Sequence, residues 1–455
     1  MARFVPLSGL HIMSFPIFPR RVYIETYGCQ MNAADSELVG GILTGHGFMF
    51  TSELSEADVV LVNTCAVRDN AERRVHGRLG LFSGYKKRNP EIIVGVLGCM
   101  AERLRTRLVD EERSVDIVVG PDEYRKLPDL IARAFEGEKG IAVRLSRVES
   151  YDDILPLRTD GVCAWLSIMR GCDKFCTFCV VPFTRGRERS RPLQSIVEEV
   201  ALLAGQGYRE VTLLGQNVNS YRDAENDFAD LMARVAAVDG SVRIRFTTSH
   251  PQDMSDKLID TIGSTGNIAR YIHLPIQSAS DRVLRMMNRT YTVDHYCSLV
   301  EKIRHALPGV SLTTDIISGF PTEALQDHER TVALMKEVRF DGAYTFKYSA
   351  RENTRAWEMA DDVSDEEKGR RVTEITELQQ GISLELNRAL LGRVERVLVE
   401  GPSRKRDADA MGRTDTNKTV VFPRTGEVRG EYVDVRIDRV NSATLFGQRV
   451  REGHA

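Results

Sequence analysis

Residues 171–179, Gly-Cys-Asp-Lys-Phe-Cys-Thr-Phe-Cys, place three cysteines within eight positions of the chain. The loop follows an apolar segment, residues 164–169, that is typical of a β-strand. Three thiolates on one loop can ligate three irons of a cubane iron–sulfur cluster, which normally takes four cysteines. Because no fourth cysteine is nearby, the spacing predicts a cluster with one open iron, as in a catalytic metal site. A zinc site completed by a distant residue, or unligated cysteines, are the alternatives.

Strand-like and helix-like segments alternate around this loop. The strand candidates are apolar and separated by helical patterns; they are residues 164–169, 211–214, 242–247, 272–275, 312–317 and 344–348. Six such units predict an open or partial (β/α)6 barrel rather than the full eight-unit barrel. A charged amphipathic helix, residues 365–391, follows them, so we expect this central domain at residues 158–390.

Three more cysteines lie in the first hundred residues, each after a β-branched run. Cys29, Cys65 and Cys99 follow residues 22–28, 59–64 and 92–98. Helix-like stretches at about residues 33–46, 66–88 and 101–112 separate the runs, and a fourth run covers residues 116–119. Buried strands alternating with helices predict a parallel α/β sheet, and ligands bind such sheets beyond the carboxyl ends of the strands. We therefore expect these cysteines to converge in a domain at residues 21–137.

The tail, residues 391–454, has a different pattern. Alternating segments at residues 393–400, 419–422, 432–437 and 444–450 with Gly-rich turns predict a small antiparallel β-barrel. From Gly392 onward it carries 13 Lys+Arg against 10 Asp+Glu, a net charge of +3, so the rest of the chain carries about −6. The positive charge is concentrated at Arg404, Lys405, Arg406 and Arg413. Contact with RNA and a solvated face both fit this charge.

The whole chain has the composition of a globular protein. Of its 455 residues, 42% are hydrophobic and 28% charged, which rules out wholesale disorder. The formal charge of −3 excludes a wholly basic nucleic-acid binder, and eight cysteines are too few for a disulfide scaffold of this size. No apolar run is long enough for a transmembrane helix, so we expect a cytoplasmic protein.

The first twenty residues favour neither a signal peptide nor a folded element. Pro6, Pro16 and Pro19 interrupt their apolar pattern, and no small-residue cleavage site follows. We expect residues 1–20 to be a short disordered extension, with Met13 as a second possible start.

The cysteine loop and its surroundings, residues 169–192, resemble the methylthiotransferase branch of the radical S-adenosylmethionine (SAM) superfamily. The likeness extends over residues 21–452; it includes residues 26–32, 63–68, 98–103, 249–251, 273–278, 287–289, 315–321 and 346–349. The tail, with residues 412–414, Asn417 and residues 421–422, resembles the RNA-binding TRAM domain. Residues 30–32, Gln-Met-Asn, and this tail favour the tRNA-modifying members over the ribosomal-protein ones.

The resemblance implies a role for each cysteine group. Cys172, Cys176 and Cys179 (the barrel triad) would hold a [4Fe-4S] cluster whose open iron binds SAM and cleaves it to a 5′-deoxyadenosyl radical. Cys29, Cys65 and Cys99 (the N-terminal triad) would hold an auxiliary [4Fe-4S] cluster carrying the sulfur to be inserted, methylated by a separate SAM. The implied cofactors are thus two clusters and two SAM molecules per turnover.

The implied reaction is methylthiolation at C2 of N6-isopentenyladenosine beside the anticodon of tRNA, a base that an anticodon loop can expose cheaply. The alternatives are N6-threonylcarbamoyladenosine in tRNA, a ribosomal protein, or a non-catalytic metal-containing RNA-binding module. The implied partners are the tRNA anticodon stem-loop, an electron donor such as flavodoxin or ferredoxin, and a sulfur or cluster-supply system. We expect a monomer.

Further site candidates have plainer alternatives. Phe178, Gln216 and Asn217 would contact SAM, with loop packing or a strand-ending turn as the alternative. Arginine suits bidentate phosphate contact, so Arg185 and Arg187, and also Arg191, are candidates for contact with tRNA or with solvent.

The remaining polar positions favour structural roles or leave the choice open. Asp315 and Lys347 lie at barrel strands, where polar groups tend to be functional, with a buried ion pair as the alternative. For His250 and His273 we favour structural roles. Cys163 and Cys297 match no triad and are expected to be buried apolar residues. The pair Glu352-Asn353 departs from the family's Pro-Gly pattern, and asparagine tolerates the positive φ of a glycine position.

Overall fold

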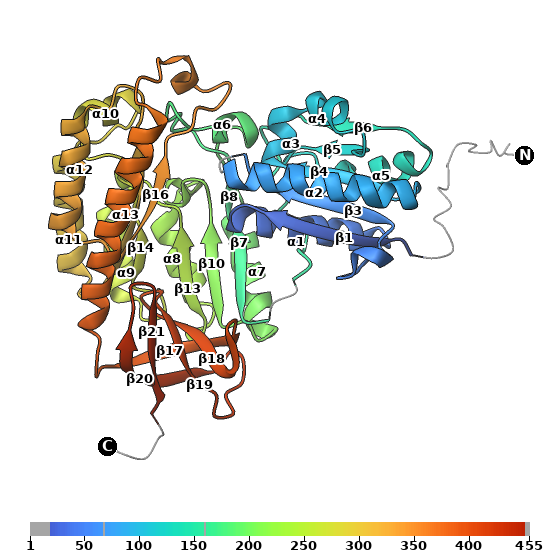
Figure 1. The fold of residues 1–455 in the computed structure, drawn as a ribbon. Coiled ribbons are helices and arrows are strands. Elements are labelled where there is room, and N and C mark those ends of the chain that lie inside the picture. The colour runs from blue at the N-terminus through green and yellow to red at the C-terminus, as the bar shows by residue number, and fades with distance from the viewer. Residues whose placement is uncertain (1–18, 67–68, 159–160, 451–455) are drawn as a thin grey trace, which may run out of the picture.

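The computed structural model describes residues 19–450 except 67–68 and 159–160, without the side chains of residues 69–71. A partial barrel occupies the centre, with a sheet domain beside it and a small closed barrel at its base (Figure 1). The expected N-terminal extension and Met13 lie outside the described residues.

The N-terminal domain is a six-stranded parallel sheet in the order β2-β1-β3-β4-β5-β6. Its strands are β1 (Arg21–Tyr27), β2 (Met49–Phe50), β3 (Val59–Thr64), β4 (Ile93–Gly98), β5 (Ile117–Val119) and β6 (Gly140–Ala142). Its helices are α1 (Gln30–Gly45), η1 (Leu54–Glu56), α2 (Asp69–Arg88), α3 (Cys99–Leu104), α4 (Thr106–Glu111), η2 (Tyr124–Lys126) and α5 (Leu127–Phe135).

Helices cover both faces of this sheet, which explains why its central strands β3 and β4 are mostly apolar and fully buried. Helices α1 and α5 pack on one face, and α2, α3 and α4 pack on the other. Strands β2 and β6 were not predicted from the sequence because they have only two and three residues. Strand β6 also lies beyond residue 137, where we expected the domain to end.

The central domain has six barrel strands: β7 (Cys163–Ser167), β10 (Glu210–Leu214), β13 (Arg243–Thr247), β14 (Tyr271–His273), β15 (Ser311–Ser318) and β16 (Gly342–Lys347). Its helices are α6 (Val181–Thr184), α7 (Leu193–Gly205), η3 (Val218–Ser220), α8 (Phe228–Ala236), η4 (Pro251–Asp253), α9 (Asp256–Ser264), α10 (Asp281–Met286), α11 (Val293–Ala306), α12 (Leu325–Val338), η5 (Arg355–Glu358) and α13 (Asp365–Arg388). Two small ribbons add β8 (Met169–Arg170) with β9 (Arg189–Ser190), and β11 (Arg222–Asp223) with β12 (Asn226–Asp227).

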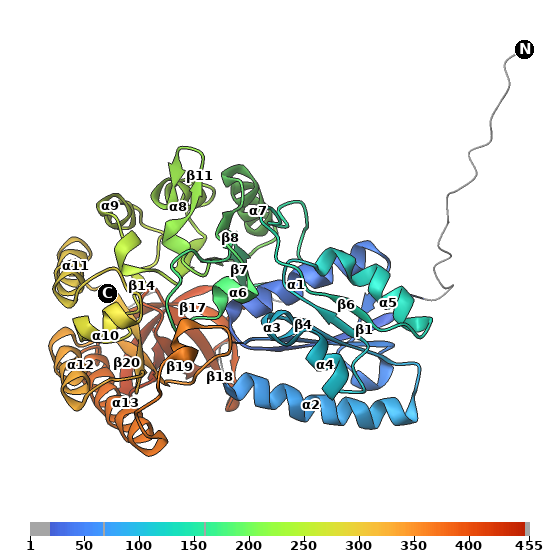
Figure 2. The ribbon, with the colours of Figure 1, turned by 90° about the horizontal axis from the view of Figure 1, so that it is seen from above.

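The barrel strands form two parallel three-stranded sheets, β13-β10-β7 and β14-β15-β16. A bridge between Ile244 and Ile268 connects them, and helices surround them on the outside (Figure 2). The apolar strand residues pack under these helices in one continuous core. All six predicted strands are present, and the predicted partial (β/α)6 barrel is confirmed.

The C-terminal domain is a closed barrel in the order β17-β18-β19-β21-β20. Its strands are β17 (Val394–Ser403), β18 (Arg406–Thr414), β19 (Thr419–Pro423), β20 (Tyr432–Val440) and β21 (Thr444–Arg449). The barrel is not wholly antiparallel as expected, because β19 and β21 pair in parallel to close it. Strand β18 was missed because its sequence, Arg-Asp-Ala-Asp-Ala-Met-Gly-Arg-Thr, lacks the apolar β-branched residues that indicate strands.

Buried charges attach the small barrel to the start of the barrel strands. Glu210 accepts hydrogen bonds from Arg243 (2.6 Å) and Arg245 (2.8 Å). The same guanidinium groups donate to the carbonyl oxygens of Arg413 and Thr414 in the small barrel. The two domains therefore meet at the end of the barrel opposite the cysteine loop. Among the helices of the described chain, none is long and apolar enough to cross a membrane.

Candidate active site at the domain interface

The N-terminal triad comes together at the carboxyl ends of three neighbouring strands. Cys29 lies between β1 and α1, Cys65 directly follows β3, and Cys99 begins α3 after β4. The thiols of Cys29 and Cys65 are hydrogen-bonded to each other. The expected convergence is therefore present, and it depends on the register of the whole sheet.

Charge around this triad favours a thiolate at one position and opposes it at another. The pKa of Cys29 is lowered to about 5 by its hydrogen bond with Cys65 and by the guanidinium group of Arg185, although burial raises it. Burial raises the pKa of Cys99, which Arg185 partly offsets.

The barrel triad lies on the single loop between β8 and α6. The backbone N–H of Gly171 donates to Oε1 of Gln216 at 2.5 Å, and Nδ2 of Asn288 donates to the carbonyl oxygens of the loop. Nη1 of Arg289 lies 3.4 Å from Sγ of Cys176. Burial raises the pKa values of Cys172 and Cys179 to about 12. Iron binding would therefore have to displace protons from these thiols.

One short segment connects the two triads. It begins at Cys179, the last cysteine of the loop, and forms α6, which lies beside α3 of the N-terminal domain (Figure 2). Val180 packs against Cys99 and Ala66. Six residues after Cys179, Nε of Arg185 lies 3.2 Å from Sγ of Cys99. The two triads are thus joined through side-chain contacts.

The prediction that Arg185 and Arg191 meet tRNA phosphates or solvent is wrong in this structure, because both side chains are buried. Arg185 pairs with Asp35 at 2.7 Å, and Arg191 pairs with Glu199 at 2.8 Å. Arg187 is exposed beside the cysteine loop and stays a candidate for RNA contact.

The expected SAM residues have contacts of their own. Gln216 holds Gly171 of the cysteine loop. Nδ2 of Asn217 donates to Asp253 at 2.7 Å, but Oδ1 of Asn217 is buried without a hydrogen-bond partner among the described residues. Phe178 packs with an apolar cluster that includes Met287 and Phe320, which matches the loop-packing alternative. A role in SAM binding stays a prediction for all three.

Two serines at the same end of the barrel were not singled out from the sequence. The hydroxyls of Ser249, just after β13, and Ser318, at the end of β15, are buried and have no hydrogen-bond partner within the described chain. A polar residue at or shortly after the end of a barrel strand is the signal that could have indicated them. With Oδ1 of Asn217, they leave three polar atoms available to a ligand.

The inner face of β16 presents aromatic side chains. Thr345 bonds to Thr376 of α13 on the outer side, so the alternation of strand residues directs Tyr344 and Phe346 inward. Their exposed fractions are 55% and 36%, which is unusual for aromatic residues of a barrel. The rings of Tyr344 and His273 are 5.7 Å apart.

Several polar candidates prove to have structural partners. Asp315 lies 3.4 Å from Nε2 of His273, whereas Lys347 pairs with Asp365 at 2.8 Å, so Asp315 and Lys347 form no ion pair with each other. His250 accepts a hydrogen bond from the backbone of Gln252, and burial lowers its pKa, as for a structural histidine.

The structure also shows the surroundings of the two cysteines outside the triads and of the pair Glu352-Asn353. Cys163 and Cys297 are half-buried rather than fully buried, and Cys297 packs against the barrel core. Asn353 has a φ of 69°, as its place at a glycine position predicts. Glu352 pairs with Arg107 of the N-terminal domain at 2.9 Å.

The basic residues of the small barrel differ in exposure. Arg404, Lys405 and Arg406 are exposed around the turn from β17 to β18. Arg413 is half-buried and pairs with Glu400 at 3.0 Å, which makes it less accessible to RNA.

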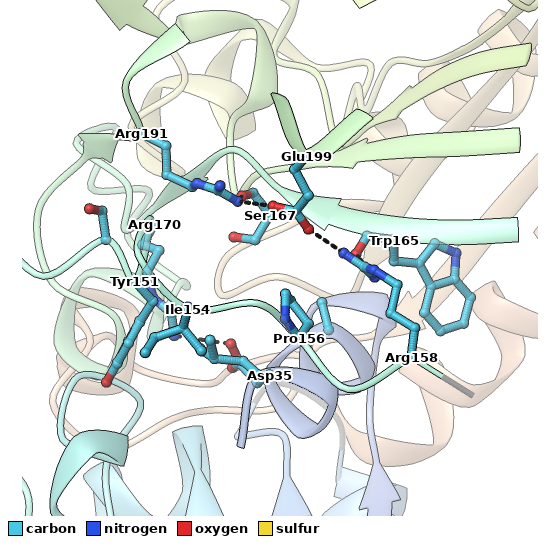
Figure 3. A pocket seen from close by; sticks show the side chains of 13 residues that line it. Asp35, Tyr151, Ile154, Pro156, Arg158, Trp165, Ser167, Arg170, Arg191 and Glu199 are labelled. Carbon is cyan, nitrogen blue, oxygen red and sulfur yellow. Dashed lines mark hydrogen bonds and ion pairs between the residues drawn. The ribbon is translucent and has the colours of Figure 1, made fainter. Parts of the chain in front are cut away.

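A pocket at the seam between the domains is too small to be the substrate site. Figure 3 shows it between α1, the segment before β7, and α7, crossed by the ion pairs of Arg170 with Asp35 and of Arg158 and Arg191 with Glu199. Its volume of about 20 Å³ is enough for one water molecule.

The residues of both triads suit an iron–sulfur cluster. Within the described residues, no three His, Cys, Asp or Glu side chains are placed to hold a single metal ion. Soft thiolate donors select iron–sulfur clusters among other soft metal centres, and each triad has a buried arginine at one sulfur. Nη1 of Arg185 and Nε of Arg289 are buried without a hydrogen-bond partner among the residues described. These donors match the negative charge of a thiolate-bound cluster.

Family models match all three domains. Residues 21–120 match the uncharacterized protein family UPF0004, residues 166–335 match the radical SAM superfamily, and residues 388–450 match the TRAM domain.

Curated relatives cover nearly the whole chain. The tRNA-2-methylthio-N(6)-dimethylallyladenosine synthase of Chloroherpeton thalassium is 51% identical over 94% of this chain and 95% of that protein. This chain belongs to the tRNA-2-methylthio-N(6)-dimethylallyladenosine synthase family. The family member of Bacteroides thetaiotaomicron is 48% identical over 95% of this chain and 96% of its own length.

Solved structures with low sequence identity share the fold. The radical SAM methyltransferase TsrM from Kitasatospora setae, with cobalamin and a [4Fe-4S] cluster bound, has a TM-score of 0.58 at 15% identity and covers 83% of this chain and 81% of its own. The cobalamin-dependent radical SAM enzyme OxsB has a TM-score of 0.53 at 12% identity, covering 80% of this chain and 56% of its own.

Proposed function

We propose that this protein adds a methylthio group to C2 of N6-isopentenyladenosine (the N6-dimethylallyladenosine of its relatives' name) in tRNA. The observation that carries the proposal is the meeting of two cysteine triads through α6 in a chain of this family. The reaction requires both a hydrogen-abstracting centre and a sulfur donor. Two adjacent triads, each with one cysteine fewer than a cubane cluster normally takes, supply a place for both.

The barrel triad is proposed to hold one [4Fe-4S] cluster with SAM, and the N-terminal triad to hold the auxiliary one. When bound, these cofactors supply the one-electron chemistry and the sulfur, with two SAM molecules used per turnover. The protein contributes binding, orientation and the exclusion of water. Gln216 sets the shape of the cysteine loop through Gly171, and Arg289 places positive charge at Cys176.

SAM has polar groups that need partners at the carboxyl ends of the barrel strands. We assign this task to Asn217, Ser249 and Ser318, whose polar atoms are buried without partners among the described residues. A ligand that donates to Oδ1 of Asn217 and bonds with the two hydroxyls would relieve the cost of leaving these atoms unpaired. Phe178 of the cysteine loop, which packs in the cluster with Met287 and Phe320, is a further proposed contact of SAM.

The modified base is proposed to enter the barrel beside Tyr344 and Phe346. A nucleobase taken out of its stack needs a replacement surface, and aromatic side chains provide it. Both rings are already exposed on the inner face of β16, next to the buried His273 and its half-buried partner Asp315. The isopentenyl group is apolar and suits the same aromatic surface.

The small barrel is proposed to bind the tRNA anticodon stem-loop through Arg404, Lys405 and Arg406, with Arg187 as a phosphate contact beside the cysteine loop. Because the substrate is tRNA, we place the reaction in the cytoplasm. A one-electron donor such as flavodoxin or ferredoxin and a sulfur or cluster-supply system are the further proposed partners of a monomeric enzyme.

Nucleoside mass spectrometry tests this function. Reconstituted protein with SAM, dithionite and tRNA bearing N6-isopentenyladenosine should form 2-methylthio-N6-isopentenyladenosine together with 5′-deoxyadenosine. The matched control is the same tRNA bearing N6-threonylcarbamoyladenosine. A product only from this control tRNA, or no 5′-deoxyadenosine from either, would contradict the proposal.

A further inference from the structure

Arg185 belongs to the barrel by sequence and to the N-terminal triad by contact. Its Nε lies 3.2 Å from Sγ of Cys99, and its Nη2 donates to Asp35 of α1 at 2.7 Å. The side chain is buried, and its remaining nitrogen, Nη1, has no hydrogen-bond partner among the described residues. One guanidinium group therefore contacts both a cysteine sulfur and a carboxylate, and keeps one N–H donor nitrogen available.

Geometry separates Arg185 from its neighbour Arg170. Arg170 also crosses to the N-terminal domain, where it donates to Asp35 at 3.0 Å and to the carbonyl oxygen of Pro121. These acceptors are oxygen atoms, whereas Arg185 also donates to a cysteine sulfur. Both arginines can dock the domains, but of the two it is Arg185 that places its charge directly on the triad.

We propose that Arg185 is a positioning residue that sets the reduction potential of the cluster held by the N-terminal triad. The proposal rests on the proposed function, in which Cys99 is a cluster ligand. A buried positive charge and an N–H···S hydrogen bond stabilise the more negative, reduced state of a cluster, and both act strongly away from water. The idle Nη1 adds a donor for a cluster sulfide or for the sulfur to be inserted.

The barrel segment therefore has two tasks. It carries Cys179, a ligand of the barrel triad, and six residues later Arg185, whose charge tunes the cluster of the N-terminal triad. Any movement of the barrel away from the N-terminal domain would remove Arg185 from Cys99 and lower the potential of the auxiliary site.

The test uses the full chain carrying Cys172→Ala, Cys176→Ala and Cys179→Ala, so that only the N-terminal triad can bind iron. Iron content and an EPR-monitored redox titration are compared for this background, for Arg185→Gln, for Arg185→Lys and for Arg170→Gln. Arg185→Gln should disfavour reduction at least tenfold, a shift of about 59 mV to more negative potential for one electron. Arg185→Lys should shift it less, and Arg170→Gln by less than half as much as Arg185→Gln.

The outcomes separate this inference from the function on which it rests. A background protein that binds no iron would contradict the proposed ligation. Bound iron with equal potentials in Arg185→Gln and Arg170→Gln would overturn the role of Arg185, because a docking role alone affects both alike. If Arg185→Gln loses its iron, Arg185→Lys becomes the deciding variant. Bound iron in Arg185→Lys with a reduction potential more negative than that of the background supports the proposal. Loss of iron from both variants of Arg185, with Arg170→Gln intact, would reduce Arg185 to a structural role.

Discussion

The two cysteine triads offer the same donor atoms, three thiol sulfurs each, but the backbone segments that carry them are arranged very differently. The barrel triad lies on one loop of eight residues, whereas the N-terminal triad takes one cysteine from each of three strand ends across 71 positions. The loop is held by residues of its own domain, among them Gln216 and Asn288. The N-terminal site needs the register of the sheet and an arginine from another domain. A site assembled from distant segments is thus more sensitive to changes in the fold than a site on one loop.

The largest expected effect comes from removing a cysteine of the barrel triad. In Cys172→Ala, cleavage of SAM to 5′-deoxyadenosine should fall to background, because the barrel triad is the group of cysteines proposed to hold the SAM-cleaving cluster. Chromatographic quantification of 5′-deoxyadenosine under excess dithionite checks this. Cys163→Ala is the matched control, since Cys163 lies at the start of β7 outside both triads. Cleavage retained in Cys172→Ala would contradict the assignment.

A second pair of variants tests whether the N-terminal triad depends on the geometry of its strand ends. Gly98 has a φ of 89°, and a Cβ there would collide with Oδ1 of Asn63 and with the backbone of Thr64. Gly98→Ala should lower the free energy of unfolding by about 1–3 kcal/mol and reduce the iron bound by the N-terminal triad.

Denaturant titration and iron analysis measure both effects. The control is Gly77→Ala on α2, where the added methyl has open space and should stabilise the helix by about 0.5–1 kcal/mol. Iron content in Gly98→Ala equal to that of the unchanged protein would show that the site tolerates distortion of its strands.

A third variant asks whether the substrate is recognised beside the barrel triad. Tyr344→Ala removes an aromatic surface worth about 1–3 kcal/mol per stacked base, so kcat/KM for tRNA should fall roughly 5- to 150-fold. Tyr344→Phe keeps the ring and should stay near the value of the unchanged enzyme. Steady-state kinetics with an anticodon stem-loop measures the difference. Equal losses in the two variants would point to the hydroxyl instead of stacking.

The smallest expected effect concerns the base of the barrel, far from both triads. Replacing Arg404, Lys405 and Arg406 together by alanine should weaken tRNA binding several-fold. The slope of the logarithm of the binding constant against the logarithm of the salt concentration should fall in magnitude by about 1 for each phosphate that the protein no longer neutralises. Fluorescence anisotropy over a salt series checks this. Lys302→Ala on the outer helix α11 is the control. An unchanged slope in the triple variant would move the RNA-binding surface elsewhere on the protein.

The sequence predicted the strand–cysteine pattern well because β3 and β4 are buried on both faces and are apolar over most of their length. It predicted all six barrel strands from short runs rich in apolar and β-branched residues, although β13 also contains Arg243 and Arg245 and β16 is partly exposed. It missed β18, whose charged residues are spread along a strand of a very small barrel, and the parallel pairing that closes this barrel.

The site could be predicted only where ligands are chemically distinctive. The type and spacing of cysteines indicate metal chemistry. An arginine in a sequence does not indicate whether its partner is a phosphate or a buried sulfur. Arg185 was expected at RNA because nothing local in the sequence shows that α6 docks against α3. The place of Ser249 and Ser318 at the ends of barrel strands is a weak signal in the sequence, and the structure adds that their hydroxyls are buried without a hydrogen-bond partner among the described residues.

The division of labour between the two triads is the central claim, and the Cys65→Ala variant tests it most directly. One reaction with SAM, dithionite and tRNA bearing N6-isopentenyladenosine is analysed for both 5′-deoxyadenosine and the 2-methylthio nucleoside. We predict that SAM cleavage continues while no 2-methylthio product forms. Loss of both products, or formation of both, would contradict this division.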